Sequence, residues 1–160
     1  MTIKELFISA LGAFIAVATA GFFSNVILAS TNTPLIVASA GASAMLVFGL
    51  PHALVSRPWN LIGGHMVSAI VGVTCCYLIS DTLLSTSIAI PIALIAMHLL
   101  KCMHAPGGAT AVTAIIGGEA VHQLGYAFVI LPIFFNSLIL LIVAISIASF
   151  REKNPFEDLL

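Results

Sequence analysis

Long apolar runs separated by short polar breaks dominate this chain. Five tracts contain no charged residue: 6–56, 58–80, 82–100, 102–118 and 120–150. About 20 helical residues cross a bilayer core of roughly 30 Å, so these tracts are long enough to hold membrane-spanning helices. We predict four long helices, over residues 6–28, 59–80, 85–103 and 124–150, with a kink at Pro132 in the last.

Two shorter segments lie between these long helices. Residues 35–49 and 107–119 are rich in Gly, Ala, Ser and Thr. The first follows the turn-forming stretch "ASTNTP", and the second follows "KCMHAPGG", in which Pro106 and two glycines oppose a continuous helix. The fold class that we predict is therefore all-α, with four long helices and two broken half-helices in one membrane domain.

Composition supports a membrane location. The chain of 160 residues is 61% hydrophobic and 7% charged, whereas a soluble domain carries about 25% charged residues. Only five residues are Lys or Arg, which argues against nucleic acid as a partner. The partner that composition indicates is the lipid bilayer.

A weak internal repeat relates the two short segments. Residues 41–44 read G-A-S-A and residues 108–111 read G-A-T-A, at an offset of 67. The order long helix, half-helix, long helix occurs in residues 6–80 and again in residues 84–150. We interpret these as two structural repeats. The alternative is a pair of small-residue helix contacts without repeat symmetry.

The charges favour repeats of inverted orientation. If each half-helix completes a crossing, one side of the membrane receives all the basic residues: Lys4, Arg57, Lys101, Arg151 and Lys153. Asp81 and Glu119 then fall on the other side. The positive-inside rule prefers this arrangement over four crossings. Three crossings per half make the repeats inverted. We expect both termini in the cytoplasm and the plasma (inner) membrane of a bacterium as the location.

The two half-helix starts predict an anion site near the bilayer midplane. Free backbone N–H groups and the positive end of a helix dipole attract anions. Gly107 and Gly108 let the backbone approach a ligand, and His104 can add charge or a proton. The predicted binding residues are Gly41, Ala42, Ser43, His65, His104, Gly107, Gly108, Ala109 and Thr110.

Further polar residues are candidates for the pathway or for proton coupling. Intramembrane ionisable groups are functional candidates by default, and Lys101 either lines the inner mouth or extends to the interface. The side-chain amides of Asn25 and Asn136 either donate hydrogen bonds to the ion or form hydrogen bonds with a neighbouring helix. These candidates are Lys101, His98, Asn25 and Asn136.

Metal and enzyme chemistry have little support. Cys75, Cys76 and Cys102 lie in apolar tracts, as inert buried thiols do. Cys102 and His104 form a potential metal pair, but no further ligand spacing completes a site. The sequence has no Ser/His/Asp set, HExxH motif or paired carboxylates. We therefore expect no metal, no cofactor and no enzymatic activity.

Three ordered motifs resemble a known family. "GASAMLVFG", "RPWNLIGGHMVSAIVG" and "MHAPGGATA" are similar to the HPP family of small integral membrane proteins, over most of residues 34–118. The motif histidine is His104 and the second motif proline is Pro106, while Ala105 replaces the first. The resemblance implies four spans and, for some members, nitrite transport in plastids and cyanobacteria.

Two functions of different class remain open at this point. The first is a transporter or channel for a small inorganic anion, with nitrite the leading candidate. The second is a structural or assembly subunit of a membrane complex, in which the broken helices serve packing. In either case the faces rich in Gly and Ala predict a homo-oligomer.

Overall fold

The computed structural model describes residues 2–28, 33–151 and 155–156, and all regular elements in these ranges are helical. η1 is a 3₁₀ turn and η2 a π-helical turn. In chain order the elements are α1 (Ile3–Leu28), α2 (Thr33–Gly49), η1 (Leu54–Ser56), α3 (Pro58–Leu78), α4 (Thr82–Leu99), α5 (Gly107–Ile116), α6 (Glu119–His122), η2 (Val129–Phe134) and α7 (Phe135–Ala148).

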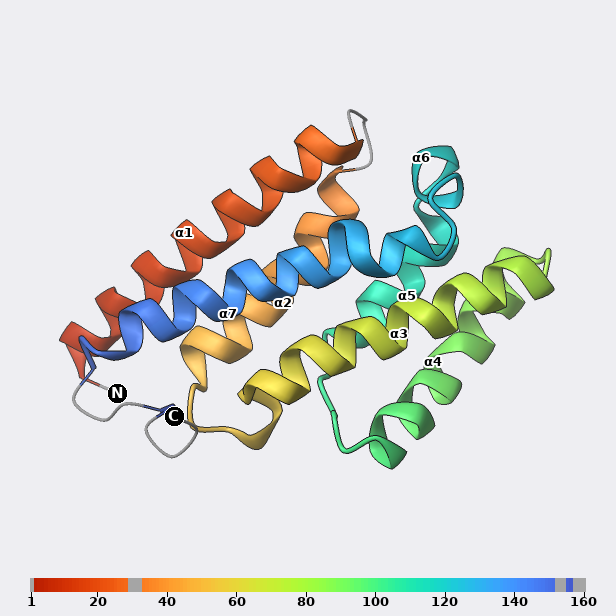
Figure 1. Cartoon of the computed structure of the whole chain (residues 1–160). Coiled ribbons are helices and arrows are strands. Elements are labelled where there is room, and N and C mark those ends of the chain that lie inside the picture. Colours follow the sequence, from red (N-terminus) through yellow and green to blue (C-terminus); the bar gives the residue numbers. More distant parts are fainter. Residues whose placement is uncertain (1, 29–32, 152–154, 157–160) are drawn as a thin grey trace.

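The long helices form one bundle. Figure 1 shows both termini, the α2–α3 connection and the α4–α5 connection at one end of this bundle. The α3–α4 turn and α6 lie at the other end. The basic residues Arg57, Lys101 and Arg151 therefore share one end, and Asp81 and Glu119 share the opposite end.

The outside of the bundle is apolar, as it is in a protein surrounded by lipid. Four helical segments are long and apolar enough to cross a membrane: Ile3–Val26, Pro58–Leu78, Thr82–Leu99 and Val129–Ala148. On α1, Phe7, Phe14 and Phe22 are 72%, 71% and 73% exposed. This protein is an integral membrane protein, and the four predicted long helices are confirmed.

Local sequence signals explain where the helices begin. Thr2 and Glu5 form a reciprocal capping box at the start of α1, with N···O distances of 2.8 and 3.2 Å. The Asp81 carboxylate caps α4 by accepting from the Leu84 amide at 2.7 Å. Pro58 occupies the first turn of α3, where its missing N–H costs no hydrogen bond.

Prolines act differently in the two later long helices. Pro91 lies inside α4 without breaking it. Pro132 lies where the chain bends, because Leu131 before it has the non-helical angles φ −120° and ψ 109°. The predicted kink at Pro132 is confirmed.

Both predicted shorter helices are present, but only the second starts where the sequence predicts. α5 is a ten-residue helix that starts at Gly107. α2 is a continuous helix of 17 residues from Thr33, so Gly41, Ala42 and Ser43 lie inside it and do not form a helix start. Pro34 falls in the first turn of α2, where proline is tolerated, so it starts this helix instead of interrupting it.

Glycines bring α3 and α5 into direct backbone contact. A Cβ atom on Gly72 would lie 2.5 Å from the Ala111 carbonyl oxygen, and one on Gly107 would lie 2.9 Å from the Gly64 carbonyl oxygen. A Cβ on Gly64 would lie 2.5 Å from the His104 Cβ. Any larger residue would force these segments apart, so the glycines set the position of the 102–110 stretch on α3.

Candidate functional site

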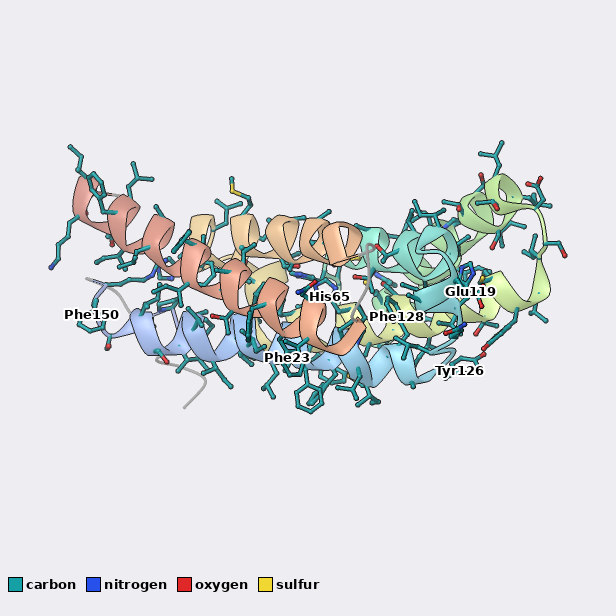
Figure 2. All side chains as sticks on the ribbon, turned by 90° about the horizontal axis from the view of Figure 1, so that it is seen from above. Phe23, His65, Glu119, Tyr126, Phe128 and Phe150 are labelled. Carbon is teal, nitrogen blue, oxygen red and sulfur yellow. The ribbon has the colours of Figure 1, made fainter. Side chains whose placement is uncertain are left out.

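Four buried polar side chains meet in the interior of the bundle. They come from α2, α3, the α4–α5 connection and α5, and we call them the polar cluster: Ser43, His65, His104 and Thr110. His65 is 4% exposed and the other three are 0% exposed. Figure 2 shows His65 about midway along the bundle, between Phe150 near one end and Glu119 near the other.

Hydrogen bonds join the polar cluster into one chain. The His65 ring contacts the Ser43 Oγ through Nε2 at 2.6 Å and the Thr110 Oγ1 through Nδ1 at 2.7 Å. The His104 Nε2 lies 3.1 Å from the same Ser43 Oγ. The His104 Nδ1 lies 2.8 Å from the Val55 carbonyl oxygen. Both nitrogens of each imidazole therefore have a partner.

The start of α3 holds the segment that carries His104. The Trp59 Nε1 donates to the Leu100 carbonyl at 3.1 Å, and the Asn60 Nδ2 donates to the Met103 carbonyl at 2.8 Å. Between these two bonds, Lys101 adopts a positive φ of 54°. The segment is thus fixed on both sides of its turn, and this fixes the position of the His104 ring.

The first turn of α5 has most of its amides already bonded. The amides of Gly107, Gly108 and Thr110 donate to the carbonyls of His104, Ala105 and Pro106 at 2.9, 3.0 and 3.4 Å. Within the described residues, the Ala109 amide has no backbone acceptor. This helix start can therefore offer one backbone donor and its dipole to an anion without local rearrangement.

The remaining predicted binding residues lie outside the polar cluster. Ala42 and Ala109 are exposed, and Gly41 and Gly108 are half-buried. A Cβ atom on Gly41 would meet nothing within 4 Å, and one on Gly108 would meet only the Ile90 Cδ1 at 3.6 Å. Neither glycine is a point of close backbone approach, and that role belongs to Gly107.

The predicted pathway residues are dispersed. Lys101 and His98 are exposed at the end of the bundle that carries the α4–α5 connection, and Asn25 is exposed on α1. Asn136 is buried on α7, where its Nδ2 donates to the Ser24 Oγ at 2.7 Å. Among the residues that the structure describes, no hydrogen bond joins Lys101, His98 or Asn136 to the polar cluster.

Sequence reasoning missed two parts of the site. The Val55 carbonyl is a backbone group, so its role cannot be predicted from the residue type. Asn60 does carry a signal, because a polar residue in the first turn of an apolar helix needs a partner.

Two buried side-chain atoms, the Ser85 Oγ and the Asn136 Oδ1, have no partner among the described residues.

The polar cluster contains donors and no carboxylate. The described acidic residues are Glu5 at the start of α1, Asp81 at the start of α4 and Glu119 in α6, which are all at ends of helices. The described residues also hold no group of three or more His, Cys, Asp or Glu that could bind a metal ion. Imidazole and hydroxyl groups are thus the chemistry that the interior offers.

These features define a small all-helical integral membrane protein with a polar cluster buried in its bundle. Residues 1–156 match the family model described as "HPP, transmembrane region". The chain belongs to this family, which confirms the resemblance of the three motifs.

Two relatives from Dictyostelium discoideum are named only as transmembrane proteins. One is 30% identical over 158 residues, covering 96% of this chain and 50% of the relative. The other is 32% identical over 125 residues, covering 76% of this chain and 44% of the relative. The chain therefore spans about half the length of these curated relatives. No solved structure matches it.

Proposed function

We propose that this protein moves a small inorganic anion across the membrane, with nitrite the leading candidate, and that the polar cluster lies on the path. The observation that carries this proposal is the burial of Ser43, His65, His104 and Thr110 midway along an apolar bundle. Polar and ionisable groups at such depth are costly, and in membrane proteins they commonly mark ion and substrate paths.

The chemistry of the polar cluster suits an anion better than a cation. Imidazole N–H and hydroxyl groups donate to anions, whereas cation paths use carboxylates or rings of carbonyls. The first turn of α5 adds a helix dipole and the Ala109 amide. One helix end contributes about 0.3–1 kcal/mol, or up to about 2 when partly buried. The energy is small, so we expect weak binding, which lets the ion leave.

The proposed topology places the basic end of the bundle in the cytoplasm. That end carries Arg57 in the α2–α3 connection, Lys101 in the α4–α5 connection and Arg151 after α7, and Figure 1 shows these two connections on one side. The positive-inside rule assigns such an end to the cytoplasm. In a bacterium this membrane is the plasma membrane. We further propose that residues 6–80 and 84–150 are inverted repeats, because the two G-A-[ST]-A hydroxyls bond the two nitrogens of one ring, that of His65.

A structural or assembly role is the second candidate, and a specific observation favours it. The glycines at 64, 72 and 107 serve close backbone packing, which a subunit of a larger membrane complex also needs. Under this alternative the polar cluster fixes the packing of α2, α3 and α5, and no ion passes it.

Flux into liposomes distinguishes these two functions. Purified protein is reconstituted and nitrite entry is followed with an internal probe, beside nitrate, formate and chloride, at a pH where little nitrous acid leaks. Thr110→Val removes a cluster hydroxyl. Ser85→Ala is the matched control, because Ser85 is a buried hydroxyl without a partner among the described residues.

We expect entry above that of empty liposomes, a decrease with Thr110→Val and no decrease with Ser85→Ala. Absence of flux for all four anions, with folded protein in the bilayer, would contradict transport and favour the assembly role.

A further inference from the structure

When both imidazole rings are neutral, the polar cluster has too few hydrogens to satisfy all its contacts at once. The Ser43 hydroxyl has a single hydrogen, yet its Oγ lies 2.6 Å from the His65 Nε2, 3.1 Å from the His104 Nε2 and 3.0 Å from the Ser39 carbonyl oxygen. Which neighbour receives that hydrogen depends on the protons carried by the two imidazole rings.

When both rings are neutral, one pattern satisfies every ring nitrogen. The Val55 carbonyl only accepts, so the His104 Nδ1 must donate and its Nε2 must accept from Ser43. The Ser43 oxygen then accepts from the His65 Nε2. The His65 Nδ1 is left as an acceptor for the Thr110 hydroxyl. The two histidines are therefore opposite tautomers.

When one proton is added, two patterns satisfy every ring nitrogen while Ser43 donates to a ring, and a third, with the proton on His104, has Ser43 donating to the Ser39 carbonyl and keeps the Thr110 hydroxyl on His65. With the proton on His65, both its nitrogens donate, and Ser43 still donates to His104. With the proton on His104, its Nε2 donates to Ser43, Ser43 donates to His65, and the His65 Nδ1 donates to Thr110. In the two patterns in which Ser43 donates to a ring, the Thr110 oxygen accepts from His65, so the hydrogen of this hydroxyl becomes available to another acceptor.

We propose that Ser43 is a proton bridge between His65 and His104, so that the pair holds one exchangeable proton. While Ser43 donates to one of the two rings and not to Ser39, this added proton frees the Thr110 hydroxyl as a donor. The transfer is balanced within the cluster. The His65 Nε2–H bond breaks as a Ser43 O–H bond forms, and the original Ser43 O–H bond breaks as a His104 Nε2–H bond forms. One positive charge moves from one ring to the other.

Few other titratable groups surround this pair. α2, α5 and α7 contain none. Cys102 is buried two residues before His104, with its Cβ against Gly63. The other titratable residues on the α2–α3 and α4–α5 connections are exposed: His52, Arg57 and Lys101. α3 carries Cys75, Cys76 and Tyr77 two or more turns beyond His65, toward the far end. No described carboxylate shares the proton.

Adding this proton to the His65–His104 pair, which we call loading, would favour an anion beside the first turn of α5. This consequence rests on the proposed function. The added proton gives the pair one positive charge and, while Ser43 donates to a ring, one hydroxyl donor at Thr110, whose neighbour Ala109 offers an amide. By linkage, an anion bound there would in turn favour loading by the same factor. The pair is thus suited to moving one proton with one anion.

Nitrogen NMR of ¹⁵N-histidine protein in bilayers tests the bridge without requiring transport. The His52, His98 and His122 rings are replaced by Gln so that only the pair is observed. At about pH 8, above the ordinary imidazole pKa of about 6.5, we expect His104 protonated on Nδ1 and His65 on Nε2. On titration to about pH 4, one imidazolium should form per pair and exchange between the two rings.

Variants at Ser43 separate the bridge from packing. Ser43→Ala should abolish the exchange between the rings, and Ser43→Thr, which keeps a hydroxyl, should retain it. Identical tautomers at high pH in the unaltered cluster, no protonation of either ring, or undiminished exchange in Ser43→Ala would each overturn the proposal.

The outcome separates the bridge from the proposed function. Correct tautomers and exchange without anion flux would leave the bridge standing and reject transport. Anion flux together with identical tautomers of the two histidines would support transport and reject the bridge. If both hold, nitrite entry should carry protons in the parent protein and lose this coupling in Ser43→Ala.

Discussion

A methyl group added at Gly64 tests the packing that positions the candidate site. Its Cβ would lie 2.5 Å from the His104 Cβ and 2.8 Å from the Cys102 carbonyl oxygen, whereas ordinary contacts are 3.4–4 Å. The Cys102 oxygen belongs to the backbone, in a segment held by Asn60 through Met103. Neither neighbour can move aside without displacing His104.

The expected magnitude follows from two opposing effects. Overpacking a tight site costs about 1–3 kcal/mol, and contact with backbone puts Gly64→Ala in the upper part of this range. Alanine in a helix gains about 0.5–1 kcal/mol over glycine. We expect Gly64→Ala to lower the free energy of unfolding by about 1–2.5 kcal/mol, the difference between these effects.

Gly41→Ala is the matched control, because a Cβ on Gly41 would meet nothing within 4 Å. Gly41→Ala should show only the stabilisation that alanine gives over glycine in a helix. The free energies of unfolding of the two variants should therefore differ by about 2–3 kcal/mol. Reversible unfolding by SDS in mixed micelles measures this difference, and anion flux measures the displacement of His104. Equal stabilities for the two variants would refute the packing argument.

Three further predictions concern the cluster, the topology and the assembly. Thr110→Val should lower the free energy of unfolding by about 1–3 kcal/mol, the cost of an unsatisfied buried imidazole nitrogen, whereas Ser85→Ala should leave it nearly unchanged; the same SDS titration compares them. In a variant without native cysteines, a cysteine at Arg57 should be labelled only from the cytoplasm and one at Glu119 only from outside, and the reverse result would reject the proposed orientation. In a mild detergent, mass measurement should find a homo-oligomer, and a monomer at all concentrations would contradict this.

The sequence predicts the long helices well because lipid imposes a simple rule. Every backbone polar group inside a bilayer needs an internal partner, so a long apolar run has to be helical. Turn and cap residues such as Asp81 then set the boundaries. The prediction failed at Gly41, Ala42 and Ser43, which lie inside α2 and do not start it. The helix begins earlier because Pro34 is tolerated in a first turn, and local sequence does not show where between Pro34 and Gly41 the helix begins.

The sequence identified the four residues of the polar cluster as candidates, but neither set them apart from the other candidates nor predicted their contacts. Ser43, His65, His104 and Thr110 stand out as polar residues in apolar tracts. Their convergence depends on how closely α3 and α5 approach, which Gly64 and its neighbours decide in three dimensions. Exposed candidates such as Lys101 carried the same sequence signal, so polarity alone could not separate the two groups.

The origin of the cluster residues bears on where an anion would pass. Each half of the chain contributes one hydroxyl and one histidine: Ser43 and His65 from residues 6–80, and His104 and Thr110 from residues 84–150. The hydroxyls occupy matching positions in the two halves, but the histidines do not. Because each half supplies only two of the four side chains, neither half could form this hydrogen-bonded chain alone. Because both halves belong to one polypeptide, the cluster is complete within a single protomer. An oligomer would then add separate paths and would not build a shared one at its interface.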